Sequence, residues 1–172
     1  MSNIRIFVSH RIDIDSETVD TPVYFPVRCG AVYDEEGNSE IQGDDTGDNI
    51  SKLRMSFCEF TVQYWAWKNV DADYYGLCHY RRYLSFSDKH YKNTAFNMVR
   101  ELRLTAHEKK KYHLDDTKKI NSVVQKYDMI IPGLAKASEM SYNRAEVETL
   151  REMWESYNGV YFEQGIIDKM FS

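Results

Sequence analysis

The sequence has none of the glycine-rich motifs by which common nucleotide-binding folds hold phosphate. It contains neither GxGxxG nor GxxxxGK[ST], so a dinucleotide-binding fold of that type and a P-loop are both excluded. It also lacks GxSxG and has no Cys–His pattern that suggests a catalytic triad.

Cysteine is scarce, and its three positions, Cys29, Cys58 and Cys78, are far apart. Because no CxxC spacing occurs, neither a zinc knuckle nor a disulfide framework is indicated. We expect reduced, buried thiols in a cytoplasmic protein.

Long apolar runs and an excess of positive charge are also absent. No run approaches the ~18 residues that a membrane span needs, and residues 1–8 lack the apolar core of a signal peptide. The formal net charge of −5 gives no general basic surface for nucleic acid. The functional basic residues must therefore be local, within one domain of 172 residues.

Three segments have the composition of β-strands. Residues 4–9 end at a His-Arg pair, residues 74–78 form a short apolar run, and residues 128–133 read as a buried strand stopped by Pro-Gly. Residues 21–27 are also extended, but their two prolines predict an irregular or peripheral segment. The alternation of helices and strands predicts an α/β fold with a mostly parallel sheet.

A helix is predicted over residues 56–69, where Ser56 and Glu59 have the spacing of a capping box. Its apolar side chains occupy two adjoining faces, which predicts burial on both sides. These faces carry Phe57, Phe60, Tyr64 and Trp67, and Cys58, Val62 and Trp65.

Two further helices are predicted toward the end of the chain. Asp115 or Asp116 can cap a helix that runs to Lys126, with Ile120 on its buried face, and Asn143 can begin another. These strands and helices are few for a complete doubly wound sheet.

The strongest candidate site is the cationic end of the strand at residues 74–78, which continues into His79, Arg81 and Arg82. Ligands of open α/β sheets bind at the carboxyl ends of the strands, and two guanidiniums with an imidazole suit a phosphate. The three side chains can converge if the strand breaks at Tyr80. The alternative is an edge strand with solvated arginines and a structural histidine.

An acidic loop precedes the first predicted helix and contains Asp44, Asp45 and Asp48. These carboxylates could hold Mg²⁺ or Mn²⁺ beside a diphosphate, accept hydrogen bonds from Arg81 or Arg82, or cap the helix. A solvated loop is the simpler alternative.

Two other features have weaker signals. Asp71 and Asp73 form a DxD sequence, but they precede a strand instead of following one, so a helix-to-strand turn is favoured. His10 follows the first strand and would lie near a ligand in the same crevice, or it is an incidental loop residue.

Four segments occur in a fixed order along the chain: Gly43–Ser51, Phe57–Thr61, Tyr64–Asn69 and Tyr75–Tyr83. Together they resemble a bacterial family of unknown-function domains from capsular and exopolysaccharide gene clusters, whose members are described as glycosyltransferases with a GT-A-like fold. The resemblance covers residues 4 to about 133, and the His-Tyr-Arg-Arg-Tyr run is its most recognisable signature.

The resemblance implies a single domain over residues 1–172, with a Rossmann-like α/β/α sandwich that can be incomplete at the C-terminus. It implies that residues 4–133 bind a nucleotide-sugar, such as a UDP-sugar, for transfer to a glycan or lipid-linked glycan at the inner face of the membrane. The cationic cluster stands about where a GT-A enzyme carries its DxD, so it could neutralise the diphosphate directly.

The implied catalytic residues are His79, Arg81 and Arg82. The nucleotide-sugar would contact the two arginines, His10 and the three aspartates, which are also the candidates for Mn²⁺ or Mg²⁺. Because family members continue further, a truncated, non-catalytic nucleotide-binding or interaction module is the alternative. A phosphoester hydrolase is less favoured, because no obvious nucleophile or paired metal-ligand set accompanies the His and Arg residues.

Overall fold

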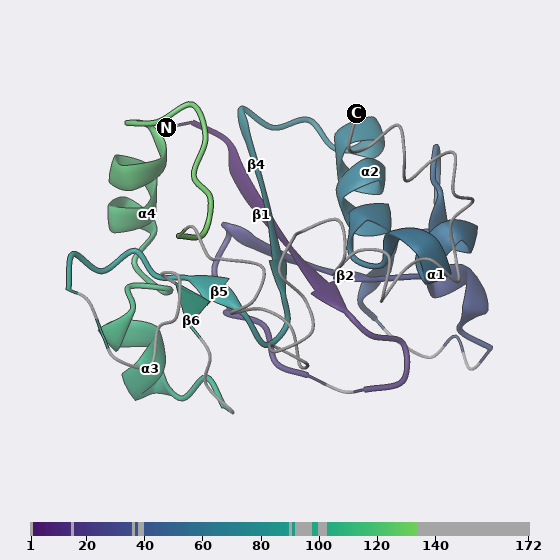
Figure 1. The fold of residues 1–172 in the computed structure, drawn as a ribbon, viewed down its shortest axis with the longest axis horizontal. Helices are drawn as coiled ribbons and strands as arrows, with labels where there is room; N and C mark the ends of the chain where they lie inside the picture. Colours follow the sequence, from purple (N-terminus) through teal and green to yellow (C-terminus); the bar gives the residue numbers. More distant parts are fainter. Residues whose placement is uncertain are drawn as a thin grey trace, which may run out of the picture. The chain divides into compact units, whose positions relative to one another are not determined.

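Four parallel strands form the central sheet of the computed structural model (Figure 1). The structure describes residues 2–14, 16–35, 37, 40–89, 91, 98–99 and 103–133. The helix expected after Asn143 lies outside these residues, and the chain divides into two units after Pro132. The strands, in the order β3-β2-β1-β4, are β1 (Ile4–His10), β2 (Tyr24–Arg28), β3 (Gln42–Gly43) and β4 (Tyr74–His79).

Short elements complete the described part of the chain. A separate antiparallel pair joins β5 (Tyr83–Leu84) to β6 (Met98–Val99). None of the described helices is long and apolar enough to cross a bilayer. They are η1 (Ala31–Tyr33), η2 (Ser51–Leu53), α1 (Arg54–Phe57), α2 (Phe60–Asn69), α3 (Ala106–Lys111) and α4 (Thr117–Val124).

The strand order creates a topological switch point between β1 and β4. The chain moves from β1 to β2 to β3 in one direction and then returns to place β4 on the other side of β1. Because all four strands are parallel, their carboxyl ends lie at one edge of the sheet. Open α/β sheets bind their ligands at such a switch point, outside the carboxyl ends of the strands.

Two apolar layers bury the faces of this sheet. On one face, Phe7 and Val27 pack with Val62 and Trp65 of α2. On the other face, the core includes Val8 and Tyr24, with Ile120 of α4. Successive residues of β1 point to opposite layers, so the strand is buried on both sides, as a central parallel strand requires.

The prediction that residues 21–27 are peripheral was wrong, since β2 lies between β1 and β3. The amide of Ile6 donates to the carbonyl of Val23, and the amide of Cys29 donates to the carbonyl of His10. The backbone N–H and C=O groups of the odd-numbered residues of β2 therefore point toward β1, whereas those of the even-numbered residues, including Pro26, point toward β3. Its missing N–H is tolerated because β3 pairs only with the two residues that follow Pro26.

The helix predicted over residues 56–69 is interrupted. Cys58 has φ 46° and ψ −127°, which ends α1 before α2 begins, and Ser56 lies within α1 instead of capping. The prediction of burial on two sides was also wrong, because only one face of α2 meets the sheet. That face carries Val62 and Trp65, whereas Phe60 and Trp67 are each 62% exposed.

Other predictions had mixed outcomes. The Asp116 carboxylate accepts a hydrogen bond from the Lys119 amide at 2.9 Å, which confirms it as the cap of α4. The strand predicted over residues 128–133 does not form, and Met129 and Ile131 are 76% and 60% exposed. An apolar run becomes a strand only when its amides find a partner, and among the described strands β4 pairs only with β1.

We expect Cys58→Gly to raise the free energy of unfolding by about 1 kcal/mol, because glycine adopts a positive φ without steric cost. Urea unfolding followed by circular dichroism measures this difference. The control is Gln63→Gly at an exposed position within α2, which should lower stability by about 1 kcal/mol. An equal loss in both variants would contradict the assignment of strain to Cys58.

Candidate functional site

The strand β4 ends at the switch point in a tight turn that displays two arginines. The Tyr80 amide donates to the Ser9 carbonyl at 3.1 Å, and the Arg82 amide donates to the His79 carbonyl at 2.8 Å. The strand thus breaks at Tyr80, which is the break that convergence of the cationic side chains requires. Arg81 and Arg82 are both exposed, and neither forms an ion pair within the described part of the chain.

Tyr80 anchors this turn, although sequence reasoning gave it no role. Its side chain is buried, and its ring lies 4.2 Å from the His79 ring and 6.2 Å from the His10 ring, between centroids. The Arg81 guanidinium lies 5.1 Å from the Tyr80 ring centroid, on the side that a cation–π contact favours. The tyrosine therefore orients one arginine and links the ends of β1 and β4.

His79 has a defined partner for each ring nitrogen. Its Nδ1 accepts a hydrogen bond from the Arg81 amide at 3.1 Å, and its Nε2 lies 3.6 Å from Glu59 Oε1. Burial lowers the pKa of His79; Glu59 opposes that shift, and Arg82 and Arg81 add to it. A neutral ring that accepts at Nδ1 carries its proton on Nε2, so the N–H is directed toward Glu59.

His10 lies at the carboxyl end of β1, as predicted, but it is buried, with an exposed fraction of 2%. Its Nδ1 lies 2.6 Å from Ser16 Oγ and its Nε2 lies 2.6 Å from Thr18 Oγ1. Both nitrogens are thus engaged by hydroxyls of the loop between β1 and β2. The contacts give His10 a part in holding that loop.

Asp44 is the most extensively bonded side chain at this edge. Oδ1 accepts from the Ala31 amide and the Ser51 hydroxyl, at 2.9 and 2.5 Å, and Oδ2 accepts from the Gly30 amide and the Thr61 hydroxyl, at 2.9 and 2.5 Å. The residue is fully buried. One carboxylate therefore joins the loops after β2 and β3 to the start of α2.

The other acidic candidates lie apart from it. Asp45 and Asp48 are exposed, and Asp48 Oδ1 accepts from the Tyr64 hydroxyl at 3.1 Å. Within the described ranges, no three His, Cys, Asp or Glu side chains form a group that could hold a metal ion. The loop follows β3, three strand spacings or roughly 14 Å from β4, so Asp44 pairs with neither arginine.

Two residues at this edge were missed by sequence reasoning, Arg54 and Glu59. The Arg54 side chain packs on Gly30, where an added Cβ would lie 2.1 Å from Arg54 Cδ. Arg54 also lowers the pKa of Asp13, after the larger effect of Arg11, so a third cation stands near this edge. The available signal was Gly30 shortly after a strand, because a residue without a Cβ allows another side chain to approach the backbone closely.

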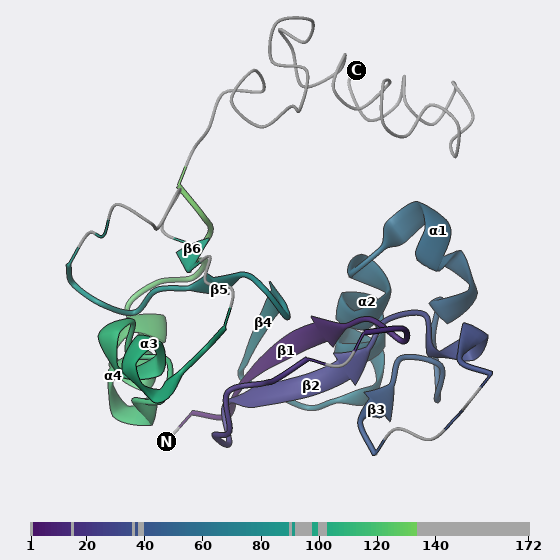
Figure 2. The ribbon, with the colours of Figure 1, turned by 90° about the horizontal axis from the view of Figure 1, so that it is seen from below.

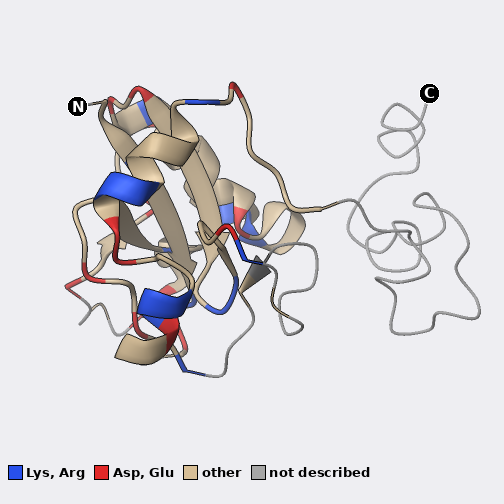
Figure 3. Ribbon diagram, turned by 90° about the vertical axis from the view of Figure 1, so that its left-hand side faces the viewer, with Lys and Arg blue, Asp and Glu red and all other residues tan. Residues whose placement is uncertain are grey.

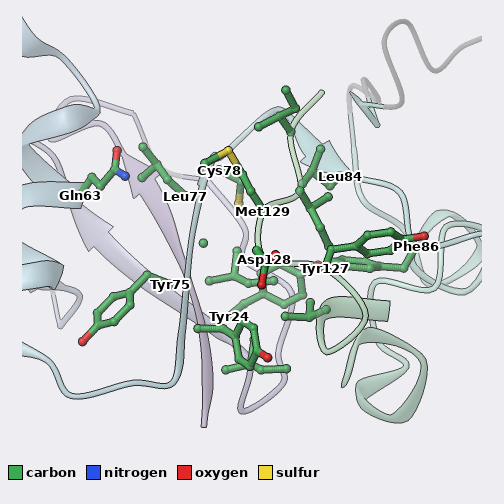
Figure 4. A pocket seen from close by; sticks show the side chains of 17 residues that line it. Tyr24, Gln63, Tyr75, Leu77, Cys78, Leu84, Phe86, Tyr127, Asp128 and Met129 are labelled. Atoms are coloured by element: carbon green, nitrogen blue, oxygen red, sulfur yellow. The ribbon is translucent and has the colours of Figure 1, made fainter. Parts of the chain in front are cut away.

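An apolar cavity of about 410 Å³ lies beside β4 (Figure 4). Its walls include Tyr75 and Cys78 of β4, together with Phe86, Tyr127 and Met129. Burial strongly raises the pKa of the Cys78 thiol, which favours its protonated form. His79 and the two arginines do not line the cavity, so it is distinct from the cationic turn.

The comparisons place this geometry among known proteins. A family model described as "Domain of unknown function (DUF4422)" matches residues 5–163. A solved apo structure of the WbbM bifunctional glycosyltransferase is similar, with 29% identity and a TM-score of 0.73 over 89% of this chain. The chain spans 26% of that protein, and no curated protein matches. The predicted GT-A-like α/β fold is confirmed, with a mostly parallel sheet and flanking helices.

We expect Asp44→Asn to lower the free energy of unfolding by about 3 kcal/mol or more, because the amide nitrogen cannot accept the hydrogen bonds that one carboxylate oxygen accepts. Urea unfolding checks this value. Asp45→Asn, at an exposed carboxylate one residue away, should change stability by less than about 0.5 kcal/mol. Equal, small effects would show that the Asp44 network contributes little.

The pKa of His79 predicts a pH-dependent stability. The folded protein binds the second proton of the His79 ring less tightly than the unfolded chain does. The free energy of unfolding therefore falls as the pH drops below 6.5, the ordinary pKa of histidine. We expect His79→Gln to reduce that fall, measured from urea midpoints at about pH 5.5 and 7.5. His107→Gln, at an exposed position, should leave it unchanged. Parallel pH curves for wild type and His79→Gln would contradict the burial-driven shift.

Proposed function

This chain belongs to the DUF4422 family, and we propose that it binds the diphosphate of a nucleotide-sugar and serves glycosyl transfer. One observation carries the proposal. Two adjacent exposed arginines, without ion-pair partners among the described residues, stand at the β1/β4 switch point. A guanidinium group can donate two parallel hydrogen bonds to phosphate oxygens, and the switch point is where open α/β sheets bind their ligands. The similarity to a glycosyltransferase supports the same assignment.

The arginines would stabilise the leaving diphosphate as negative charge develops during transfer. The contact between Arg81 and the Tyr80 ring holds one guanidinium in place before the ligand binds, which reduces the cost of ordering it. Fixed positive groups that face a developing charge can lower an activation barrier by several kcal/mol. Arg82, whose backbone closes the turn on His79, would supply the second fork.

His79 would donate a hydrogen bond from Nε2 to a phosphate or sugar oxygen. The neutral ring keeps its proton on that atom because the Arg81 amide occupies Nδ1. Glu59, at 3.6 Å, can hold the ring and accept the same N–H when no ligand is bound. His79, Arg81 and Arg82 would then be the catalytic residues.

The remaining predicted residues would act on the loops around the nucleotide. Through their hydrogen bonds, His10 shapes the loop after β1 and Asp44 joins the loops after β2 and β3. Asp44, Asp45 and Asp48 do not fit one shared Mg²⁺ or Mn²⁺ site in this arrangement, because the Asp44 oxygens already accept four hydrogen bonds. We therefore assign charge neutralisation to the guanidiniums.

The wider role that fits this chemistry is assembly of a capsular or exopolysaccharide at the cytoplasmic face of the membrane. The donor would be a UDP-sugar, the acceptor a glycan or lipid-linked glycan, and residues 4–133 would form the donor-binding part of a single domain. The second candidate is a non-catalytic nucleotide-binding module.

We expect Arg81→Ala and Arg82→Ala each to weaken UDP binding about 10- to 100-fold, because each removes charge-assisted hydrogen bonds to phosphate. Isothermal titration calorimetry with UDP, with and without Mn²⁺, measures the change. Arg103→Ala removes another exposed arginine and should have no effect.

The outcomes separate the candidates. Unchanged UDP affinity in folded Arg81 and Arg82 variants would contradict the diphosphate site. UDP binding without sugar transfer or donor hydrolysis, across UDP-, GDP- and CMP-sugars, would favour the binding module over the enzyme.

A further inference from the structure

The strand β4 forms one edge of the central sheet, where it lies beside β1 on the side away from β2 (Figure 2). The Tyr80 amide donates to the Ser9 carbonyl, so the even-numbered residues of β4 direct their N–H and C=O groups toward β1. The same groups of Tyr75 and Leu77 then point away from β1. They have no hydrogen-bond partner within the described ranges. An unpaired row of backbone donors and acceptors therefore runs along this edge.

The two edges of the sheet differ in length and in charge. β3, at the other edge, has two residues, and so short a strand offers little backbone to a foreign chain. β4 has six residues, and Tyr74–Cys78 contain neither a charge nor a proline that would oppose pairing. Charge lies on other elements, such as the basic last turn of α3, which Figure 3 shows in blue. The sequence of β4 thus leaves its outer edge open to another strand.

The apolar cavity of about 410 Å³ lies along this edge (Figure 4). β4 contributes Tyr74–Cys78 to its lining, and the segment Tyr127–Ile131 contributes another wall. Within the described chain, residues 128–131 belong to no strand, although their composition predicts one, and Met129 and Ile131 are 76% and 60% exposed. One cavity is therefore bordered by two stretches of chain that can pair with a strand and are unpaired.

The chemistry of the cavity matches an extended polypeptide. Backbone groups that alternate along an edge pair with another backbone, whose groups repeat at the same spacing, and paired strands lie about 4.8 Å apart. Among the described residues that line the cavity, Asp128 is the only charged one. An inserted segment would therefore carry apolar side chains, as strands that are buried on both faces do.

Two other occupants fit less well. A small apolar molecule would fill the cavity but leave the N–H and C=O groups of Tyr75 and Leu77 unpaired, which costs free energy where water is excluded. A second copy of this chain would bring its own β4, which is already paired with β1 and so has one free edge. A segment that pairs with β4 and with residues 128–131 together needs both of its edges free.

We propose that the cavity beside β4 accepts an extended segment of a partner protein, which adds a strand to the central sheet. Its backbone pairs with Tyr75 and Leu77, and its apolar side chains pack against the aromatic and aliphatic side chains that line the cavity. This inference does not rest on the proposed function, because the cationic turn does not line the cavity.

Hydrogen exchange of the full chain, followed residue by residue by NMR, tests whether the edge is free. We expect the amides of Tyr75 and Leu77 to exchange at least about tenfold faster than those of Gly76 and Cys78, which face β1. Equal protection of both pairs would show that the edge is already paired within the chain and would overturn the proposal.

The probe for a partner strand is the peptide acetyl-Lys-Thr-Val-Thr-Val-Thr-Val-Lys-amide, in which apolar residues alternate. We expect saturable binding below about 1 mM peptide that slows exchange at Tyr75 and Leu77. The same peptide N-methylated at its valines keeps the side chains but loses the donors of one edge, so it should bind at least about tenfold more weakly. Absence of protection at the highest concentration, or equal binding of the two peptides, would contradict strand addition.

Variants of the chain test the walls and the edge separately. Met129→Ser/Ile131→Ser removes exposed apolar side chains from one wall and should weaken peptide binding at least about tenfold. Leu77→Pro removes an outward N–H, leaves the bonds of its neighbours to β1 in place, and should also weaken binding. Phe60→Ser/Trp67→Ser removes exposed apolar groups from α2 as the matched control and should leave peptide binding unchanged.

Retained peptide binding by the Met129/Ile131 variant would overturn the proposal. So would a concentration-dependent dimer that Leu77→Pro abolishes, because the edge would then pair with a second copy. UDP titration of the same variants separates this inference from the proposed function: peptide binding without UDP binding retains the strand site and contradicts the diphosphate site.

Discussion

Pairing of β1 with a parallel neighbour on each side is the constraint on which the rest of the structure depends. The carbonyls of Ser9 and His10, at the end of β1, accept the amides of Tyr80 and Cys29 respectively. These two hydrogen bonds fix the points where β4 and β2 stop and where their loops begin. They also place the loops that follow β1 and β4 side by side at the switch point, where open α/β sheets bind ligands.

The interruption at Cys58 connects this edge to the helical layer. The positive φ of Cys58 turns the chain between α1 and α2. Glu59, the next residue, then lies with its Oε1 3.6 Å from His79 Nε2. Asp44 holds the same region from the other side, through Thr61 at the start of α2. The strained residue therefore lies close to a buried carboxylate with four donors, and backbone strain of this kind is concentrated at functional sites.

Much of the arrangement could be predicted from the sequence. β1, β4 and the cap at Asp116 follow from local composition, and the cationic turn follows from the position of His79, Arg81 and Arg82 after a strand. Other features could not be predicted. Pro26 indicated a peripheral segment because no local pattern shows which amide of β2 faces β1, and the apolar run at residues 128–133 carries no information about an available strand partner.

The sequence by itself determined the residue types at the carboxyl edge and the α/β class, because strand composition and charge are local properties. Only the tertiary structure decided which groups these residues contact and which of them are buried. It engaged His10 with two hydroxyls, buried Asp44 instead of leaving it in a solvated loop, and turned Phe60 and Trp67 outward. The physical reason is that a helix offers one face to a sheet and a hydrogen-bonding group takes the nearest donors, and both depend on residues far apart in the chain.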